Sequence, residues 1–107
     1  LLEVPAGIIE DDESPIECAQ RELQEEIGYR AGDLKILSEF WTAPGFSDEL
    51  MYGYLARDLT KSSLPADYDE NIEIIRIPFD DILASISRGE IKDAKTIATL
   101  LMASSLK

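Results

Sequence analysis

Three glutamates, Glu22, Glu25 and Glu26, stand close together in a segment whose apolar residues recur at helical spacing. At about 100° per residue, they fall on neighbouring parts of one helix surface. Like charges at this spacing destabilise a helix, and anions are disfavoured near its C-terminal end. A hard divalent cation reverses this penalty, because Mg²⁺ binds carboxylate oxygens. For three acids taken alone, a solvated acidic face is the favoured interpretation, and a magnesium site is the alternative.

The residues around this cluster form a longer pattern. Its other members are two glycines, a glutamate, an arginine and a final tyrosine: Gly7, Gly28, Glu13, Arg21 and Tyr29. In residue type and spacing, the pattern resembles the Nudix box at every constrained position, so the chain resembles the Nudix hydrolases. The resemblance extends over essentially all residues. It implies an α/β fold in which a mixed β-sheet is sandwiched between helices.

The resemblance implies a metal site on the first helix. Glu22 and Glu26, one helical turn apart, would bind Mg²⁺ together with the carbonyl of Ala6, and Mn²⁺ would be a substitute ion. Glu25 would lie close by as a catalytic residue. The remaining members of the pattern would have structural roles. Glu13 and Arg21 would form an ion pair. Gly7 would allow a close approach of the backbone, and Gly28 would end the helix.

Pro44 lies sixteen residues after Gly28, in a segment rich in turn-forming residues. A proline at this distance resembles the ADP-ribose pyrophosphatase branch of the family, and a plain turn is the alternative. The resemblance implies hydrolysis of the pyrophosphate bond of ADP-ribose to AMP and ribose 5-phosphate. The residues expected to contact substrate are Ile8, Ala43, Pro44, Gly45 and Glu49. Alternatives are another nucleoside diphosphate sugar or a dinucleotide as substrate, or a metal-binding or dimerisation module without turnover.

The general base is expected in the loop before the last predicted strand. The resemblance implies a glutamate there, for which Glu70 is the first choice and Glu73 the second. Family members often carry two acids two residues apart in this loop, whereas this chain has Tyr68 at one such position. A solvated loop acid is the alternative for either glutamate.

Local signals predict the elements that carry these residues. Ser14 suits a helix N-cap, Pro15 the first helical position, Glu17 a capping box, and Gly28 the stop. Residues 1–4 have the pattern of a strand end. Alternation and turn signals predict strands at 34–42, 50–59 and 72–77, and helices at 80–87 and 91–106.

Composition excludes several classes of function. The 107 residues contain 22 acids, 10 bases and no His, for a formal net charge of −12. The lack of His excludes His-based zinc sites and Ser-His or Cys-His nucleophiles. The acidic balance argues against nucleic acid as a partner. Apolar runs are too short for a membrane span, and the lone Cys18 favours a cytoplasmic setting and a structural rather than nucleophilic thiol.

The length suits one domain. We expect residues 1–107 to form a single Nudix hydrolase domain that is N-terminally incomplete, because family members carry strands before the box. The resemblance also implies a homodimer as the assembled form.

Overall fold

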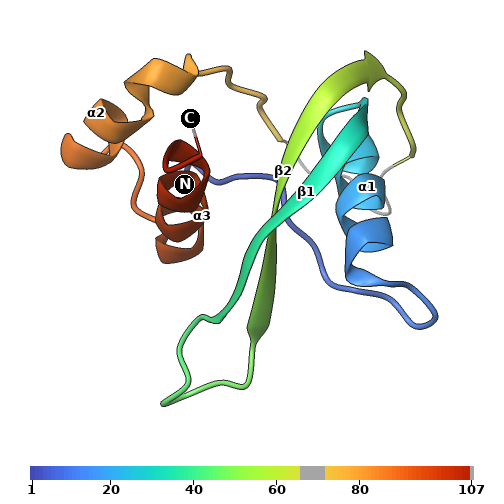
Figure 1. Ribbon diagram of the computed structural model, residues 1–107, viewed down its shortest axis with the longest axis horizontal. Helices are drawn as coiled ribbons and strands as arrows, with labels where there is room; N and C mark the ends of the chain where they lie inside the picture. The colour runs from blue at the N-terminus through green and yellow to red at the C-terminus, as the bar shows by residue number, and fades with distance from the viewer. Residues whose placement is uncertain (66–71, 107) are drawn as a thin grey trace. The chain divides into compact units, whose positions relative to one another are not determined.

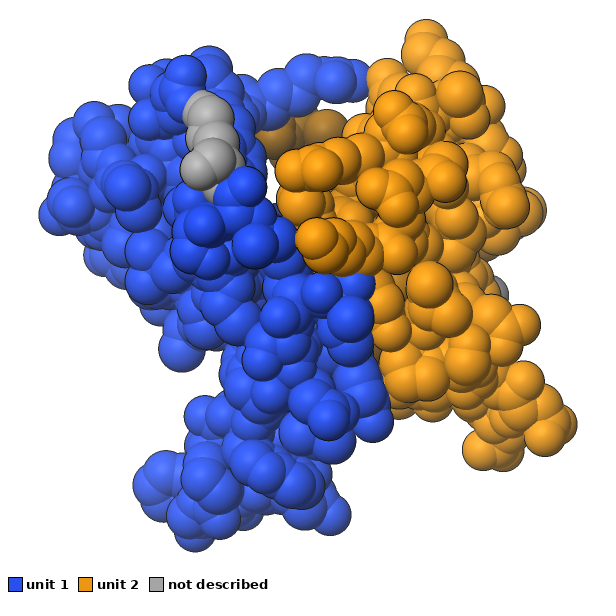
Figure 2. Space-filling model, in the orientation of Figure 1, with its two compact units in different colours: residues 1–4, 36–53, 76–107 blue, residues 5–35, 54–75 orange. Residues whose placement is uncertain are grey.

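The computed structural model describes residues 1–65 and 72–106 (Figure 1). The elements follow in the order α1 (Pro15–Glu26), β1 (Tyr29–Trp41), β2 (Leu50–Lys61), the 3₁₀ turn η1 (Phe79–Asp81), α2 (Ile82–Ser87) and α3 (Ala94–Ser104). The chain forms two compact units, coloured separately in Figure 2. Unit 1 comprises Leu1–Val4, Ile36–Gly53 and Arg76–Lys107, and unit 2 comprises Pro5–Lys35 and Tyr54–Ile75.

Helix α1 begins and ends where local chemistry predicts. The Ser14 hydroxyl accepts a hydrogen bond from the Glu17 N–H, and the Glu17 carboxylate accepts one from the Ser14 N–H at 2.9 Å. Both halves of the capping box are therefore present, with Pro15 at the first position. After the helix, Gly28 adopts a φ of +75°, a left-handed conformation that glycine reaches without strain.

Replacing Gly28 by alanine is expected to lower the free energy of unfolding by about 1–2 kcal/mol, because a side chain is strained at this φ. An added Cβ would also lie 2.9 Å from the Ser63 Oγ. Gly89 is a matched control, since its φ is +74° and an added Cβ would meet nothing within 4 Å. Urea unfolding of both alanine variants separates the backbone strain, which they share, from the Ser63 contact. An unchanged free energy of unfolding in Gly28→Ala would contradict the left-handed conformation assigned to Gly28.

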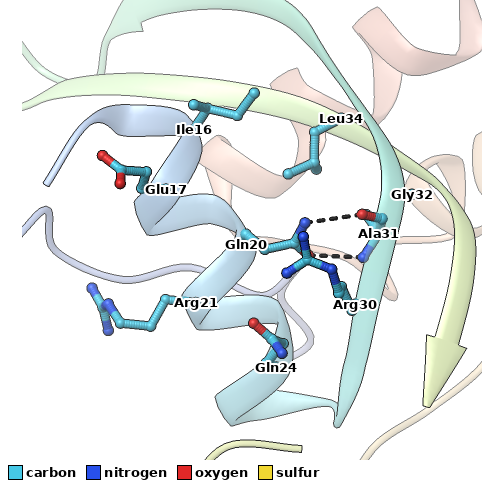
Figure 3. A pocket seen from close by; sticks show the side chains of 9 residues that line it. All are labelled: Ile16, Glu17, Gln20, Arg21, Gln24, Arg30, Ala31, Gly32 and Leu34. Carbon is cyan, nitrogen blue, oxygen red and sulfur yellow. Dashed lines mark hydrogen bonds between the residues drawn. The ribbon is translucent and has the colours of Figure 1, made fainter. Parts of the chain in front are cut away.

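Strands β1 and β2 form a two-stranded sheet joined by a hairpin connection. Both strands are longer than predicted, since β1 begins at Tyr29 rather than 34 and β2 continues to Lys61. The extra residues of β1 are held partly by a helix side chain. The Gln20 amide donates to the Ala31 carbonyl at 2.9 Å and its oxygen accepts from the Ala31 N–H at 2.8 Å (Figure 3).

Two predicted strands are wrong. Residues 1–4 and 72–77 have no strand conformation, and the sheet found among the described residues contains only β1 and β2. A strand depends on hydrogen bonds to a neighbour, which sequence alternation cannot supply. Instead of pairing in a sheet, the Val4 N–H donates to the Thr96 hydroxyl at 3.2 Å. The expected mixed α/β class holds, with a smaller sheet than predicted.

The two C-terminal helices are shorter than predicted. α2 is preceded by the turn η1 rather than beginning at 80, and α3 begins at Ala94 rather than 91. Asp93 sets the start of α3, because its carboxylate accepts from the Thr96 N–H at 3.0 Å as an N-cap does. The buried residues of unit 1 come mainly from this region: Ile82, Ser85, Ile91, Thr96 and Ala103.

Within residues 1–65 and 72–106, every helix is too short or too polar to cross a membrane.

Candidate metal and active site

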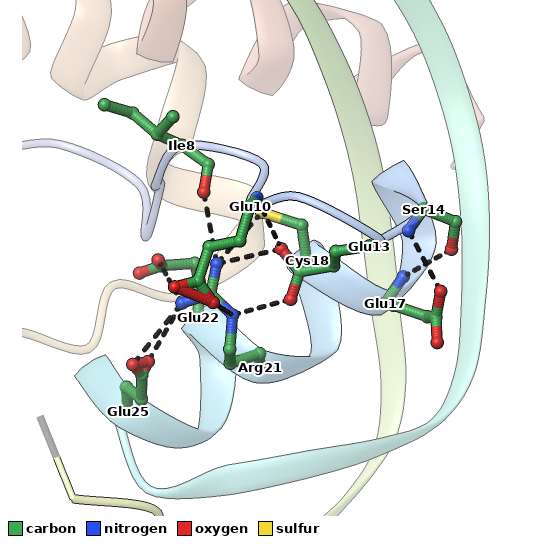
Figure 4. Close-up of polar contacts among 9 residues, drawn as sticks. All are labelled: Ile8, Glu10, Glu13, Ser14, Glu17, Cys18, Arg21, Glu22 and Glu25. Carbon is green, nitrogen blue, oxygen red and sulfur yellow. Dashed lines mark hydrogen bonds and ion pairs between the residues drawn. The ribbon is translucent and has the colours of Figure 1, made fainter.

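Unit 2 gathers carboxylates around Arg21, on the face of α1 that meets the preceding loop (Figure 4). Arg21 Nε lies 2.6 Å from Glu13 Oε2, and Nη2 donates to Glu13 Oε1 at 3.0 Å. Arg21 Nη1 lies 2.8 Å from Glu22 Oε1 and 3.1 Å from Glu25 Oε2. We call Arg21 and its acidic partners Glu10, Glu13, Glu22 and Glu25 the Arg21 cluster. The structure thus contains the Glu13–Arg21 pair that links loop to helix.

Charge pairing favours the ionised forms of Glu13 and Arg21. The hydrogen bond from Arg21 is the main reason that the pKa of Glu13 falls from 4.5 to about 2, and the Glu10 backbone adds to the effect. The same bond raises the pKa of the Arg21 guanidinium, so the pair is fully charged at neutral pH. Because the pKa of Glu13 is depressed, its contribution to stability is present above about pH 4.5 and is lost as the pH falls towards 2.

The backbone at Ala6 and Gly7 lies against the carboxylates of α1. A Cβ built at Gly7 would overlap the Glu22 carboxylate, so this position accepts only glycine without a shift of Glu22. The Ala6 N–H donates to Glu26 Oε2 at 3.2 Å. The family resemblance implies the carbonyl of Ala6 as the contributing group, whereas a hydrogen bond between Ala6 and Glu26, the predicted ligand, is made by the Ala6 N–H. Two of the predicted metal-binding carboxylates therefore converge on one short backbone segment.

The donor set fits a hard cation, since such a cation binds oxygen ligands, and the Glu22 carboxylate lies beside the Gly7 backbone. In their present positions, however, the described residues include no group of three or more His, Cys, Asp or Glu side chains arranged to hold a metal ion. Arg21 Nη1 binds Glu22 and Glu25, while Glu26 accepts from the Ala6 N–H.

The predicted substrate residues are divided between the units. Ile8 is exposed in unit 2, and its carbonyl accepts from Arg21 Nη2 at 3.1 Å. In unit 1, the connection between β1 and β2 is an ordered turn, because the Ala43 carbonyl accepts from the N–H groups of Phe46 and Ser47, both at 2.9 Å. Pro44 and Gly45 lie within this turn. At its base, the Thr42 hydroxyl donates to Glu49 Oε1 at 2.8 Å.

The predicted general base, Glu70, lies outside the described residues. The second choice, Glu73, is described and exposed, in a segment without helix or strand.

Two features near α1 were not predicted from the sequence. Glu10 Oε1 lies 3.2 Å from Arg21 Nε, and the Glu10 N–H donates to Glu13 Oε1 at 3.0 Å. The run of acids at Glu10–Glu13 was the available signal. The second feature is a hollow of about 470 Å³ beside β1 (Figure 3), lined by Ile16, Glu17, Gln20, Arg21, Gln24, Arg30, Ala31, Gly32 and Leu34. Its lining shares only Arg21 with the Arg21 cluster.

Cys18 is a structural residue of α1. Its side chain is buried, and burial followed by the Glu13 charge raises the pKa of the thiol to about 11. A thiol with this pKa is protonated at neutral pH and is a poor nucleophile. Its burial within α1 agrees with the interpretation of Cys18 as a small helix residue.

Comparison with known proteins agrees with the family resemblance of the sequence. The family model of the NUDIX domain matches residues 1–100. The chain is 39% identical over 98 residues to a Bacillus subtilis (strain 168) protein named ADP-ribose pyrophosphatase, covering 90% of this chain and 53% of that protein. It is also 39% identical over 103 residues to a Yersinia pestis protein named GDP-mannose pyrophosphatase, covering 94% and 52%.

A solved structure described as an ADP compounds hydrolase superimposes with a TM-score of 0.86 at 30% identity, covering 94% of this chain and 54% of that one. The chain therefore spans about half the length of the relatives that it matches. Together with the family match over residues 1–100, the fold and the spacing of the carboxylates on α1 show that this chain belongs to the NUDIX domain family.

Proposed function

We propose that the protein hydrolyses the pyrophosphate bond of ADP-ribose to AMP and ribose 5-phosphate in a Mg²⁺-dependent reaction. The observation that carries the proposal is the approach of the Gly7 backbone to the Glu22 carboxylate, with Glu26 on the neighbouring Ala6. The Bacillus subtilis relative and the matched solved structure, both named for hydrolysis of ADP compounds, support this choice of substrate.

Glu22, Glu26 and the Ala6 carbonyl would hold the metal, with Mn²⁺ as a substitute. When bound, the cation would supply positive charge to the pyrophosphate and would acidify water. The need for such a cation follows from the formal net charge of −12, because the acidic face of α1 repels an anionic substrate by itself. Gly7 would allow the substrate phosphates to approach the loop backbone, since the position carries no side chain.

The remaining groups would position the substrate and move a proton. Glu25, beside the proposed metal ligands, and Glu70 are proposed as the catalytic carboxylates. Glu70 would orient water and accept its proton as the oxygen attacks phosphorus. The turn containing Ala43, Pro44 and Gly45, together with Glu49 and Ile8, would contact the rest of the substrate.

A second candidate substrate is GDP-mannose. The Yersinia pestis protein named GDP-mannose pyrophosphatase supports it, since this chain is 39% identical to that protein and to the Bacillus subtilis protein alike. Incubation of the purified protein with ADP-ribose, GDP-mannose and a dinucleotide, each with and without Mg²⁺, separates the candidates by their products. We expect AMP and ribose 5-phosphate from ADP-ribose as the fastest reaction. Faster release of GMP from GDP-mannose would favour the second candidate. Binding of Mg²⁺ without turnover of any substrate would favour the metal-binding module.

The single domain over residues 1–107, the homodimer and the cytoplasmic location stay predictions.

A further inference from the structure

The hollow between α1 and β1 is separate from the proposed metal and substrate sites. Its volume of about 470 Å³ is within the range of roughly 300–1,000 Å³ that is usual for small-molecule sites. Its lining residues all belong to unit 2. Arg21 is the one lining residue that also belongs to the Arg21 cluster, and its guanidinium is already paired there with Glu13, Glu22 and Glu25. The rest of the hollow has no role in the proposed reaction.

The two ends of the hollow differ in chemistry. Ile16 and Leu34 lie at one end, and Gln24 and Arg30 lie at the other (Figure 3). At about 1.5 Å per helical residue, Ile16 and Gln24 are about 12 Å apart along α1. At about 3.3 Å per strand residue, Arg30 and Leu34 are about 13 Å apart along β1. The hollow therefore suits an elongated ligand that is apolar at one end and charged at the other.

The charged end holds an arginine that is free to bind an anion. Within residues 1–65 and 72–106, the Arg30 guanidinium makes no hydrogen bond or ion pair, although the chain has a large excess of acids. Its side chain extends from β1 towards α1 (Figure 3). A guanidinium presents several N–H donors in one plane, and these match the oxygens of a phosphate group. Arg30 can therefore bind a phosphate within the hollow.

The apolar end disfavours an anion and suits a ring. Ile16 leaves 45% of its surface exposed, and Leu34 is half-buried. Glu17 stands beside Ile16 on α1, and its Oε1 accepts from the Ser14 N–H at 2.9 Å. The negative charge of Glu17 repels an anion from this end, whereas a planar ring would remove the two aliphatic side chains from water. These groups orient a ligand with its anionic end at Arg30.

Between the two ends, the walls are polar and fixed. Gln20 joins α1 to β1 across the hollow, because its amide donates to the Ala31 carbonyl at 2.9 Å and accepts from the Ala31 N–H at 2.8 Å. Gln24 Nε2 donates to Ser62 Oγ at 2.9 Å, and its Oε1 has no donor in the described part of the chain. Such walls suit the hydroxyl groups of a sugar better than an alkyl chain. A site that is already formed also loses little freedom on binding.

We propose that the hollow between α1 and β1 binds a nucleoside monophosphate. Its phosphate would bind Arg30, its ribose would lie beside Gln24, and its base would cover Ile16 and Leu34. Base, sugar and phosphate follow in the same order as the apolar, polar and cationic parts of the hollow. A sugar phosphate lacks the base, and a nucleoside lacks the phosphate, so each of them matches only part of the hollow. No metal ion is required, because the guanidinium supplies the positive charge.

Calorimetric titration with AMP in EDTA tests the proposal independently of hydrolysis at the proposed metal site. We expect the wild type to bind AMP and Arg30→Gln to bind it at least about tenfold more weakly, because a charge-assisted hydrogen bond is lost. Arg57→Gln is the matched control. Arg57 is exposed on β2 in the same unit, outside the hollow, and its replacement removes the same charge without a change in AMP affinity. A wild type that binds no AMP, or equal affinities of the Arg30 and Arg57 variants, overturns the proposal.

The apolar end is tested with Ile16→Ser and with parts of the ligand. Ile16 is partly exposed, and circular dichroism checks that the variant keeps its fold. We expect this variant to bind AMP roughly threefold more weakly and ribose 5-phosphate as the wild type does, because only AMP carries a ring to cover Ile16. In the wild type, ribose 5-phosphate and adenosine should each bind more weakly than AMP. Ribose 5-phosphate bound as tightly as AMP would show that the hollow recognises phosphate alone, and the assignment to a nucleotide would be wrong.

Discussion

Replacing Glu22 or Glu26 by glutamine is expected to lower Mg²⁺-dependent hydrolysis of ADP-ribose by at least about a hundredfold. Each substitution keeps the size of the side chain and removes the negative charge that a hard cation requires. The two carboxylates converge on the backbone of Ala6 and Gly7, so neighbouring acids cannot replace them without a shift of the loop. AMP release at saturating substrate, measured over a range of Mg²⁺ concentrations, gives the effect on both turnover and metal dependence.

Glu90→Gln is the matched control for these variants. Glu90 is an exposed acid of unit 1 whose carboxylate accepts from Arg88, outside the Arg21 cluster. Its substitution removes the same charge and should leave hydrolysis unchanged. Full Mg²⁺-dependent activity in both Glu22→Gln and Glu26→Gln would show that the metal site lies elsewhere. Circular dichroism of each variant distinguishes loss of the site from loss of the fold.

Thr96→Val is expected to lower the free energy of unfolding by about 2–4 kcal/mol, the largest stability effect that we predict. Thr96 is buried, with 2% of its surface exposed, and its hydroxyl donates to Asp93 Oδ2 at 2.8 Å while accepting from the Val4 N–H. Valine has nearly the same shape and lacks the hydroxyl. The substitution therefore leaves one donor and one acceptor without this partner, and unfolding in urea measures the cost.

Thr99→Val, in the same helix, controls for the change of residue type. The Thr99 hydroxyl donates to the Lys95 carbonyl one turn earlier, a local bond that adds little to helix stability. Its replacement should change the free energy of unfolding by less than about 0.5 kcal/mol. Similar losses for both variants would mean that the contact between Val4 and Thr96 does not stabilise unit 1.

Helix α1 could be predicted from the sequence in detail. Its capping box, its first proline and the glycine after it act within a few residues, so their effect does not depend on the rest of the fold. The same is true of the spacing of Glu22, Glu25 and Glu26, because helical geometry places residues three and four apart on one side. The family resemblance relied on these local relations, and the family match agrees with it.

Strand predictions were less accurate because pairing is not local. The segment 72–77 alternates as a strand does, yet among the described residues it joins no sheet. Conversely, β1 begins at Tyr29, earlier than its composition indicated, where the Gln20 side chain pairs with the Ala31 backbone. Neither outcome follows from alternation alone, since a strand forms only where a partner presents hydrogen-bonding groups.

From the sequence alone, Glu22, Glu25 and Glu26 could be assigned to one side of a helix, because motif spacing on a helix converts directly into position on its surface. Tertiary structure decided what those residues contact. The overlap of a Gly7 side chain with Glu22, the bond from Ala6 to Glu26, and the choice of Arg21 partners all depend on how the loop folds back on α1. Such contacts join groups far apart along the chain, and only the folded backbone brings them within hydrogen-bonding distance.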